Sequence, residues 1–541
     1  MIDAPVALPG TLDGDVSDAA PPAALEYREP ARGIVRVRPS RRMVAAIALF
    51  AAAALISGFT MLQAVDPFDE GLVLQAARRV AGGQVPYRDF LWAYGPAQPY
   101  LLGALSKVFG PSLIQWRILR VLADAGVSLT VFALARRGAA RPAVAVAAWL
   151  AVAGEMAEPR SANPFPFALL AALVAFFVAT GGGRRRVAAA AALTVVAAAF
   201  RLDFGLYALA GIAVTFALRD GPRAAARYLL ASVAGTALVY LPFAILDGPA
   251  SLYQALIGTS LRTGSYWTLP FPLHFHAPPH AGIAKTAKKL VDFYVPALLV
   301  TGAALSALGA ALLTRRERRP PAPDVGLLVF AAGGLAYLLS RTDEFHTAPL
   351  FAVVAALLAG FASRRAGLAL AVPCAAVLGL LLVHGAANRL SAATRPPAMA
   401  AIDVPVADGA KAPPAEARAL ERVVALVQAR VPPGQPIYVA PRRSDLVRFN
   451  NPLVNVLTDR DNPTREDFGL QAGAAAQRRI VAVLARVRPR AIVRWTDPLS
   501  SRPEPNAGGR ATGVRILDSW ISAHYRLLER LYHYDVLVPR G

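Results

Sequence analysis

The chain has 541 residues, enough for several soluble domains, but only 17% of its residues are charged and 55% are hydrophobic. A typical soluble domain has roughly 25% charged residues, so this composition excludes an ordinary soluble protein. The charge is basic, with 57 Lys+Arg against 35 Asp+Glu, yet the arginines lie in short clusters between long apolar runs. That arrangement indicates a membrane protein and not a nucleic-acid-binding face.

The N-terminal residues 1–40 are rich in Pro, Ala and acidic side chains, which predicts a disordered tail. The first apolar run, Met43 to Ala64, is long enough to cross a bilayer, and no small-residue cleavage site follows it. We therefore expect a retained helix, and similar runs predict about eleven membrane helices in all. The further runs lie near residues 112–135, 142–157, 163–180, 187–200, 204–218, 228–246, 291–314, 325–340, 347–362 and 366–386.

Arginine clusters occupy every second loop between these runs, on the side of the N-terminus. Cytoplasmic loops are enriched in Lys and Arg, so the pattern places the N-terminus in the cytoplasm and the alternate loops outside. The Ala- and Arg-rich usage is typical of a high-GC bacterium, which predicts a bacterial inner membrane. The arginine-rich segments are residues 32–42, 136–141, 184–186, 219–227, 315–319 and 364–365.

The first outward loop, residues 65–111, is rich in acidic and aromatic residues. Asp69 and Glu70 open a helix-like stretch directly after the first membrane helix, with Asp66 before them and Asp89 after them. One interpretation is helix capping, because carboxylates at a helix N-terminus meet the positive end of its dipole. The other is a functional acidic site, which the aromatic rings favour because they suit the membrane interface and stacking on sugars.

Two later outward segments supply cations. Arg201 lies between two short apolar runs, where it either pairs with Asp203 or binds a phosphate. Arg341 and His346 lie in the segment 340–349, where charged residues at a membrane boundary are costly without partners. This segment is either an ion-pair cluster or part of a phosphate or acceptor site. The loop 247–290 combines Lys, Arg and aromatic residues, which predicts a gating loop over a lipid or a merely amphipathic loop.

The region from 391 to 541 no longer has membrane-length apolar runs, and its pattern predicts a small extracytoplasmic α/β domain. No glycine-rich phosphate-binding motif follows its predicted strands, so nucleotide binding has no support. Helices are expected over residues 414–431, 467–487 and 514–531, and strands over 436–440, 453–457, 491–495 and 535–538.

The acidic loop also carries a family resemblance. The Asp-Glu pair at Asp69 and Glu70, the sequence Gly-Gly-x-x-Pro-Tyr-x-Asp over 82–89 and the stretch ending in Phe-Gly at 109–110 resemble the GT-C glycosyltransferases. The likeness is to the branch of protein O-mannosyltransferases and lipid A aminoarabinose and galacturonosyl transferases. It implies a GT-C-like transmembrane domain over 41–390, with a catalytic first outward loop at 65–111. It also implies a polyprenyl-phosphate sugar as donor and Asp69 as the essential carboxylate, with Glu70 beside it.

The residue types fit that chemistry. Inverting transfer needs a carboxylate base for the acceptor hydroxyl, which we expect to be Asp69, and cations for the phosphate that leaves. Asp66 and Asp89 are candidates for orienting the acceptor or for binding a divalent cation, and the sequence leaves the metal open. The candidates for the donor phosphate are Arg201, Arg341 and His346.

The expected partners are the lipid-linked donor, a lipid, glycan or protein acceptor of the cell envelope, and membrane lipids, but no nucleic acid. Two other functions stay open. A transporter or lipid flippase keeps charges at mid-membrane, whereas here the acids gather at one surface. A catalytically inactive GT-C-like assembly protein keeps the fold without using the carboxylate.

Overall fold

A computed structural model describes residues 40–158, 163–271, 321–363, 368–467, 469 and 471–541. The chain divides into two units, residues 1–44 and 45–541, and the second contains nearly all of the described fold. The predicted disordered tail, apart from residue 40, the span predicted over 291–314 and residues 272–290 of the loop 247–290 lie outside the described residues.

The described residues contain seven helices that are long and apolar enough to cross a membrane. Three further apolar helices are shorter, and each predicted span within the described ranges corresponds to one helix of either kind. The protein is therefore a polytopic α-helical membrane protein, as the apolar runs predict. The long helices are α1 (Arg41–Gly58), α4 (Leu113–Arg137), α8 (Leu202–Asp220), α9 (Pro222–Asp247), α14 (Ala322–Ser340), α15 (Glu344–Ser363) and α16 (Leu368–Thr394), and the shorter ones are α5 (Pro142–Glu155), α6 (Phe165–Ala179) and α7 (Arg186–Phe200).

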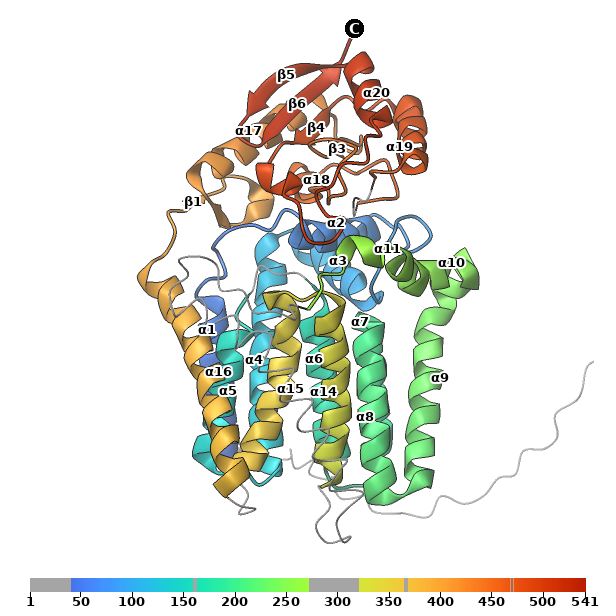
Figure 1. The fold of residues 1–541 in the computed structure, drawn as a ribbon. Coiled ribbons are helices and arrows are strands. Elements are labelled where there is room, and N and C mark those ends of the chain that lie inside the picture. The colour runs from blue at the N-terminus through green and yellow to red at the C-terminus, as the bar shows by residue number, and fades with distance from the viewer. Residues whose placement is uncertain (1–39, 159–162, 272–320, 364–367, 468, 470) are drawn as a thin grey trace, which may run out of the picture. The chain divides into compact units, whose positions relative to one another are not determined.

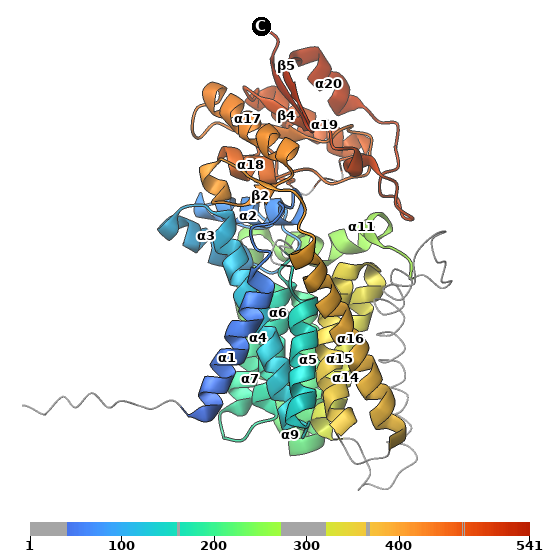
Figure 2. The same ribbon diagram turned by 90° about the vertical axis from the view of Figure 1, so that its left-hand side faces the viewer.

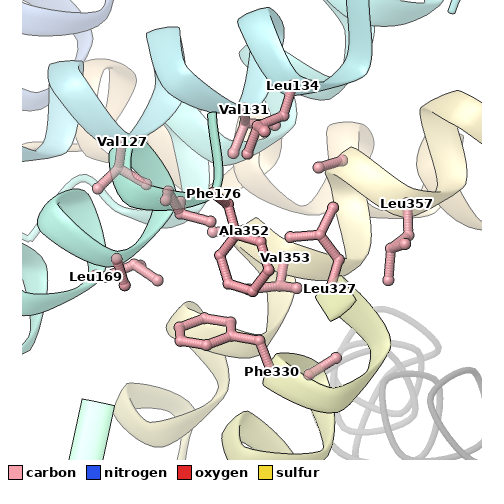
Figure 3. Close-up of a cluster of buried hydrophobic side chains, with 14 of the residues drawn as sticks. Val127, Val131, Leu134, Leu169, Phe176, Leu327, Phe330, Ala352, Val353 and Leu357 are labelled. Atoms are coloured by element: carbon pink, nitrogen blue, oxygen red, sulfur yellow. The ribbon is translucent and has the colours of Figure 1, made fainter. Parts of the chain in front are cut away.

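The core of this bundle is apolar and lies between α4, α6, α14 and α15 (Figure 3). Small residues let neighbouring helices approach closely, as is usual where lipid supplies no hydrophobic driving force. At the crossing of α8 and α14, a Cβ atom on Gly326 would lie 2.4 Å from the carbonyl oxygen of Gly211. Only glycine fits at this crossing. The labelled core side chains are Val127, Val131, Leu134, Leu169, Phe176, Leu327, Phe330, Ala352, Val353 and Leu357.

Several arginine-rich loops meet at one end of the bundle, which we call the arginine end (residues 136–141, 181–186 and 219–222). Arg219 donates to the carbonyl oxygen of Gly181 at 3.2 Å, and Arg186 pairs with Asp220. These alternate loops therefore lie on one side of the bundle, as the order of the predicted membrane helices requires. Which side of the membrane this is remains a prediction.

The opposite end of the bundle carries the first long loop and the segment after α9, and we call it the loop end. Figures 1 and 2 show α2, α3 and α11 between the bundle and the C-terminal strands. The elements at this end are α2 (Asp69–Ala81), α3 (Ala97–Phe109), α10 (Pro249–Tyr253), a π-helical turn (Gln254–Gly258) and α11 (Thr259–Trp267).

The C-terminal region contains a four-stranded sheet in the order β3-β4-β6-β5. β3 and β4 are parallel, and β6 pairs antiparallel with both β4 and β5. A short antiparallel pair, β1 (Ala400–Ala401) and β2 (Lys411–Ala412), precedes the sheet. The strands are β3 (Tyr438–Ala440), β4 (Ile492–Trp495), β5 (Tyr525–Leu531) and β6 (Tyr534–Pro539), and the helices are α17 (Pro414–Arg430), α18 (Leu453–Thr458), α19 (Ala474–Val487) and α20 (Ile516–His524).

Two of the C-terminal predictions are wrong. The strand predicted over 453–457 is the helix α18, whose residues are all buried; periodicity alone does not separate a short buried strand from a buried helix. The helix predicted over 514–531 ends at His524, and its second half is the edge strand β5. That segment is rich in Leu, Glu and Arg, which favour helices, but its pairing with β6 overrides the local preference. The helix predicted over 467–487 begins only at Ala474.

Candidate active site

Asp66 fixes the start of α2 and with it the position of Asp69. The Oδ1 atom of Asp66 accepts hydrogen bonds from the amides of Phe68 at 2.9 Å and of Asp69 at 3.1 Å. Amides at a helix start lack partners within the helix, so this carboxylate satisfies them. Of the two interpretations of the acidic loop, capping therefore describes Asp66. Asp69 itself is the first residue of α2, and its side chain is partly exposed.

Glu70 is fully buried against α4. Its Oε1 atom lies 2.7 Å from Nε of Arg117, and its Oε2 atom lies 2.8 Å from Nη2 of the same guanidinium. Arg117 also donates to the carbonyl oxygens of Met61 and Ala64, at 2.6 and 2.8 Å. This pair fastens the start of α2 to the chain around it. The expectation that Glu70 stands beside Asp69 as a second catalytic group is not supported, because both of its oxygens are bonded to Arg117.

The segment between α14 and α15 is organised by Asp343. Its Oδ1 atom accepts the amide of His346 at 3.0 Å and lies 2.6 Å from Nδ1 of that ring, and its Oδ2 atom lies 2.8 Å from Nε of Arg341. Burial raises the pKa of Asp343, but the hydrogen bonds from His346 and the charge of Arg341 outweigh it and lower the pKa overall. An ionised Asp343 therefore holds both predicted cations in place. The sequence predictions for this segment name its cations as site residues and not Asp343, although the spacing Arg-x-Asp-x-x-His is a local signal for it.

Arg201 is held on several sides at the junction of α7 and α8. Its guanidinium makes two contacts with Asp203, at 2.6 and 3.0 Å, and donates to Asn163 Oδ1 at 2.8 Å and to the Tyr337 hydroxyl at 3.2 Å. The Tyr337 ring lies 4.4 Å from the His346 ring, between centroids. Tyr337 thus connects Arg201 with the His346 segment.

These elements converge on Asp69. Burial, together with the carboxylates of Asp66 and Asp343, raises the pKa of Asp69 to about 8, although the charges of Arg341 and Arg201 act in the opposite direction. The structure therefore brings Asp69, Arg201, Arg341 and His346 to one place at the loop end, from segments far apart in the sequence. A strongly shifted carboxyl among specific charges is typical of a functional site.

Asp89 lies apart from this cluster. It pairs with Arg88 at 2.8 Å and accepts the amide of Val85 at 2.7 Å, and the hydrogen bonds from Arg88 lower its pKa. It lines a different groove of about 720 Å³, shared with Asp461 and Arg465. The predicted role of Asp89 beside Asp69 is not supported, because its carboxylate closes a local turn.

Within the described ranges, no group of three or more His, Cys, Asp or Glu side chains is arranged to hold a metal ion. The divalent cation stays a prediction.

Comparisons with known proteins address the fold. No family model and no curated protein matches the chain. Among solved structures, ArnT from Cupriavidus metallidurans in the apo state matches at a TM-score of 0.52 and 14% identity, over 91% of this chain and 98% of ArnT. ArnT is a GT-C glycosyltransferase. This chain has the GT-C fold.

Two longer GT-C proteins match less closely. The arabinosyltransferase EmbB from Mycobacterium smegmatis has a TM-score of 0.39 at 15% identity, over 86% of this chain and 39% of EmbB. The arabinofuranosyltransferase AftD from Mycobacteria has a TM-score of 0.48 at 15% identity, over 92% of this chain and 42% of AftD. The chain therefore spans less than half of either protein, and the fold assignment rests on ArnT. The GT-C-like fold expected from the Asp-Glu pair and its surroundings is confirmed.

Proposed function

We propose that the protein is an integral membrane glycosyltransferase that moves a sugar from a polyprenyl-phosphate donor to a cell-envelope acceptor. The observation that carries the proposal is the convergence of Asp69, Arg201 and Arg341 at the loop end of a GT-C fold. An acid with a raised pKa beside guanidinium groups suits transfer between a hydroxyl and a phosphate ester.

Asp69 is the proposed base. The acceptor oxygen attacks the anomeric carbon, the bond from that carbon to the phosphate oxygen breaks, and the acceptor proton passes to Asp69. A pKa raised to about 8 makes the ionised carboxylate of Asp69 a stronger base than an ordinary aspartate, so it takes up the acceptor proton more readily. Attack opposite the leaving phosphate inverts the anomeric configuration.

The leaving phosphate gains charge as the bond breaks, and cations stabilise that charge. Arg201 already donates to Asp203, Asn163 and Tyr337, so its contacts favour a positioning role. Nε of Arg341 pairs with the Asp343 carboxylate, and the His346 ring contacts the same carboxylate. We assign Arg341 as the principal phosphate ligand, with His346 beside it.

The orientation belongs to the same proposal. Arginine-rich loops are typical of the cytoplasmic side, which supports a location of the loop end, and with it Asp69, on the outer face of a bacterial inner membrane. Lipid-linked sugar and an envelope acceptor meet on that face.

Substitution of Asp69 tests the proposal. We expect Asp69→Asn to abolish sugar transfer from a polyprenyl-phosphate donor in purified proteoliposomes, because an amide does not accept the proton. Glu529→Gln is the matched control, since Glu529 pairs with Arg422 on the surface of the C-terminal sheet. Transfer by Asp69→Asn at the wild-type rate would overturn the role of Asp69. A folded wild-type chain that transfers no sugar to any envelope fraction would favour the inactive assembly protein.

A further inference from the structure

The C-terminal region reaches the proposed phosphate ligand. Arg341 Nη2 lies 3.1 Å from Oε1 of Glu504, and its Nη1 lies 3.4 Å from Oε2 of the same carboxylate. Glu504 opens a tight turn in which its own amide donates to the carbonyl oxygen of Gly508 at 2.8 Å. The turn is fastened to α11 by the amide of Ala507, which donates to the carbonyl oxygen of Ser265 at 3.3 Å.

A second guanidinium approaches the same carboxylate from the C-terminal region. Arg448 Nη1 lies 3.7 Å from Oε1 of Glu504, beyond hydrogen-bond distance, and its Nη2 donates to the carbonyl oxygen of Arg502. The Arg448 side chain is only 12% exposed. Glu504 therefore stands between two guanidinium groups, one from the membrane bundle and one from the C-terminal region.

The residue after Arg448 fixes this segment beside Asp69. The Phe449 ring stacks on Trp267 of α11, with centroids 4.3 Å apart and planes at 17°. It also contacts Phe68, with centroids 3.7 Å apart. Phe68 directly precedes Asp69, so the backbone that carries Arg448 packs on the residue next to the proposed base.

Arg341 and Arg448 share the carboxylate of Glu504. Burial lowers the pKa of Arg448, the carboxylate of Glu504 raises it, and the charge of Arg341 lowers it. Two guanidinium groups facing one carboxylate have the donor arrangement that also suits a phosphate, whose several oxygens accept from both.

We propose that Glu504 occupies the place of a phosphate monoester, and that Arg448 binds this phosphate together with Arg341 once Glu504 moves aside. The inference rests on the proposed function, whose donor carries its phosphate as a diester and releases it as a monoester. It makes Arg448 and Glu504 parts of the donor site that the C-terminal region contributes.

Binding of a polyprenyl monophosphate to the full-length protein in detergent tests the inference without requiring sugar transfer. Arg448→Ala is expected to weaken binding about tenfold or more, as the loss of a hydrogen bond to a charged group does. Arg448→Lys, which keeps the charge but not the planar fork, is expected to lie between that variant and the wild type. Glu504→Gln is expected to tighten binding by about two- to fivefold, because it removes a partly exposed competing charge.

A control variant and two control ligands distinguish recognition of the phosphate from other effects on binding. Arg422→Ala, which breaks an exposed pair in the C-terminal region, is expected to bind the probe as the wild type does. Neutral polyprenol is expected to bind Arg448→Ala and the wild type equally, and inorganic phosphate is expected to compete in the wild type more than in Arg448→Ala.

Each adverse result has a distinct meaning. Unchanged affinity in Arg448→Ala, an equal loss for neutral polyprenol, or weaker binding by Glu504→Gln would overturn the inference while leaving Asp69 and the proposed transfer untouched. A wild-type protein that binds no polyprenyl monophosphate would overturn the inference and the donor class of the proposed function together.

Discussion

The proposed base Asp69 gives a prediction for the pH dependence of sugar transfer. Burial raises its pKa to about 8, and a base must lose its proton before it accepts another, so kcat/KM is expected to rise with pH and to level off above about 8. Asp343→Asn removes a negative charge that raises this pKa, so the midpoint is expected to move to lower pH. The measurement is kcat/KM against pH for both proteins, and a flat profile between about pH 6 and 9 would contradict it.

Glu70 and Arg117 give a second prediction at the residue scale. Both side chains are fully buried, so Glu70→Gln leaves a buried guanidinium without its counter-charge and is expected to destabilise the protein by about 3–5 kcal/mol. Replacing both partners, in Glu70→Gln/Arg117→Met, is expected to restore part of that loss. Thermal unfolding in detergent, with a transfer assay alongside, separates the roles. Normal stability with no activity in Glu70→Gln would make Glu70 a catalytic group after all.

At the scale of single elements, the crossing of α8 and α14 depends on glycine. A Cβ atom on Gly326 would lie 2.0 Å from Oγ1 of Thr215 and 2.4 Å from the carbonyl oxygen of Gly211. Gly326→Ala is therefore expected to lower stability by about 1–3 kcal/mol through overpacking. Gly379→Ala on α16 is the control, because its added Cβ meets nothing within 4 Å among the described residues. Equal melting temperatures for the two variants would contradict this prediction, because they would show that the two helices move apart to accommodate the added methyl group without loss of stability.

The helices and strands also show how much of the fold can be predicted from the sequence. Apolar length predicted the membrane helices because a bilayer imposes one length on every span. The segments around β5 and α18 were assigned wrongly because pairing and burial, and not local preference, decide short elements. In the site, Arg341 and His346 were predicted because they share one short segment, whereas Glu504 reaches Arg341 only through tertiary folding and has no local signal.

At the scale of the whole molecule, ion pairs, one of them buried, join α2 to the C-terminal region. Arg79 Nε lies 2.7 Å from Oδ2 of Asp467, with both side chains almost fully buried, and Arg78 pairs with Asp461 at 2.7 Å. The helix that starts at Asp69 is therefore held to the membrane bundle by the pair of Glu70 with Arg117, and to the C-terminal region by the pairs of Arg78 and Arg79 with these aspartates. The sequence predicts the C-terminal region as a separate domain, because no local pattern indicates contacts between residues so far apart in the chain.

The last prediction concerns orientation, on which the proposed chemistry depends. In a Cys374→Ser background, which removes the single cysteine, we expect Glu529→Cys to react with a membrane-impermeant maleimide in intact spheroplasts. Arg184→Cys, at the arginine end, is expected to react only after permeabilisation, because arginine-rich loops stay in the cytoplasm. The reverse labelling would place Asp69 and the C-terminal region in the cytoplasm. The site would then face away from an outer-face donor and acceptor, whatever its internal geometry.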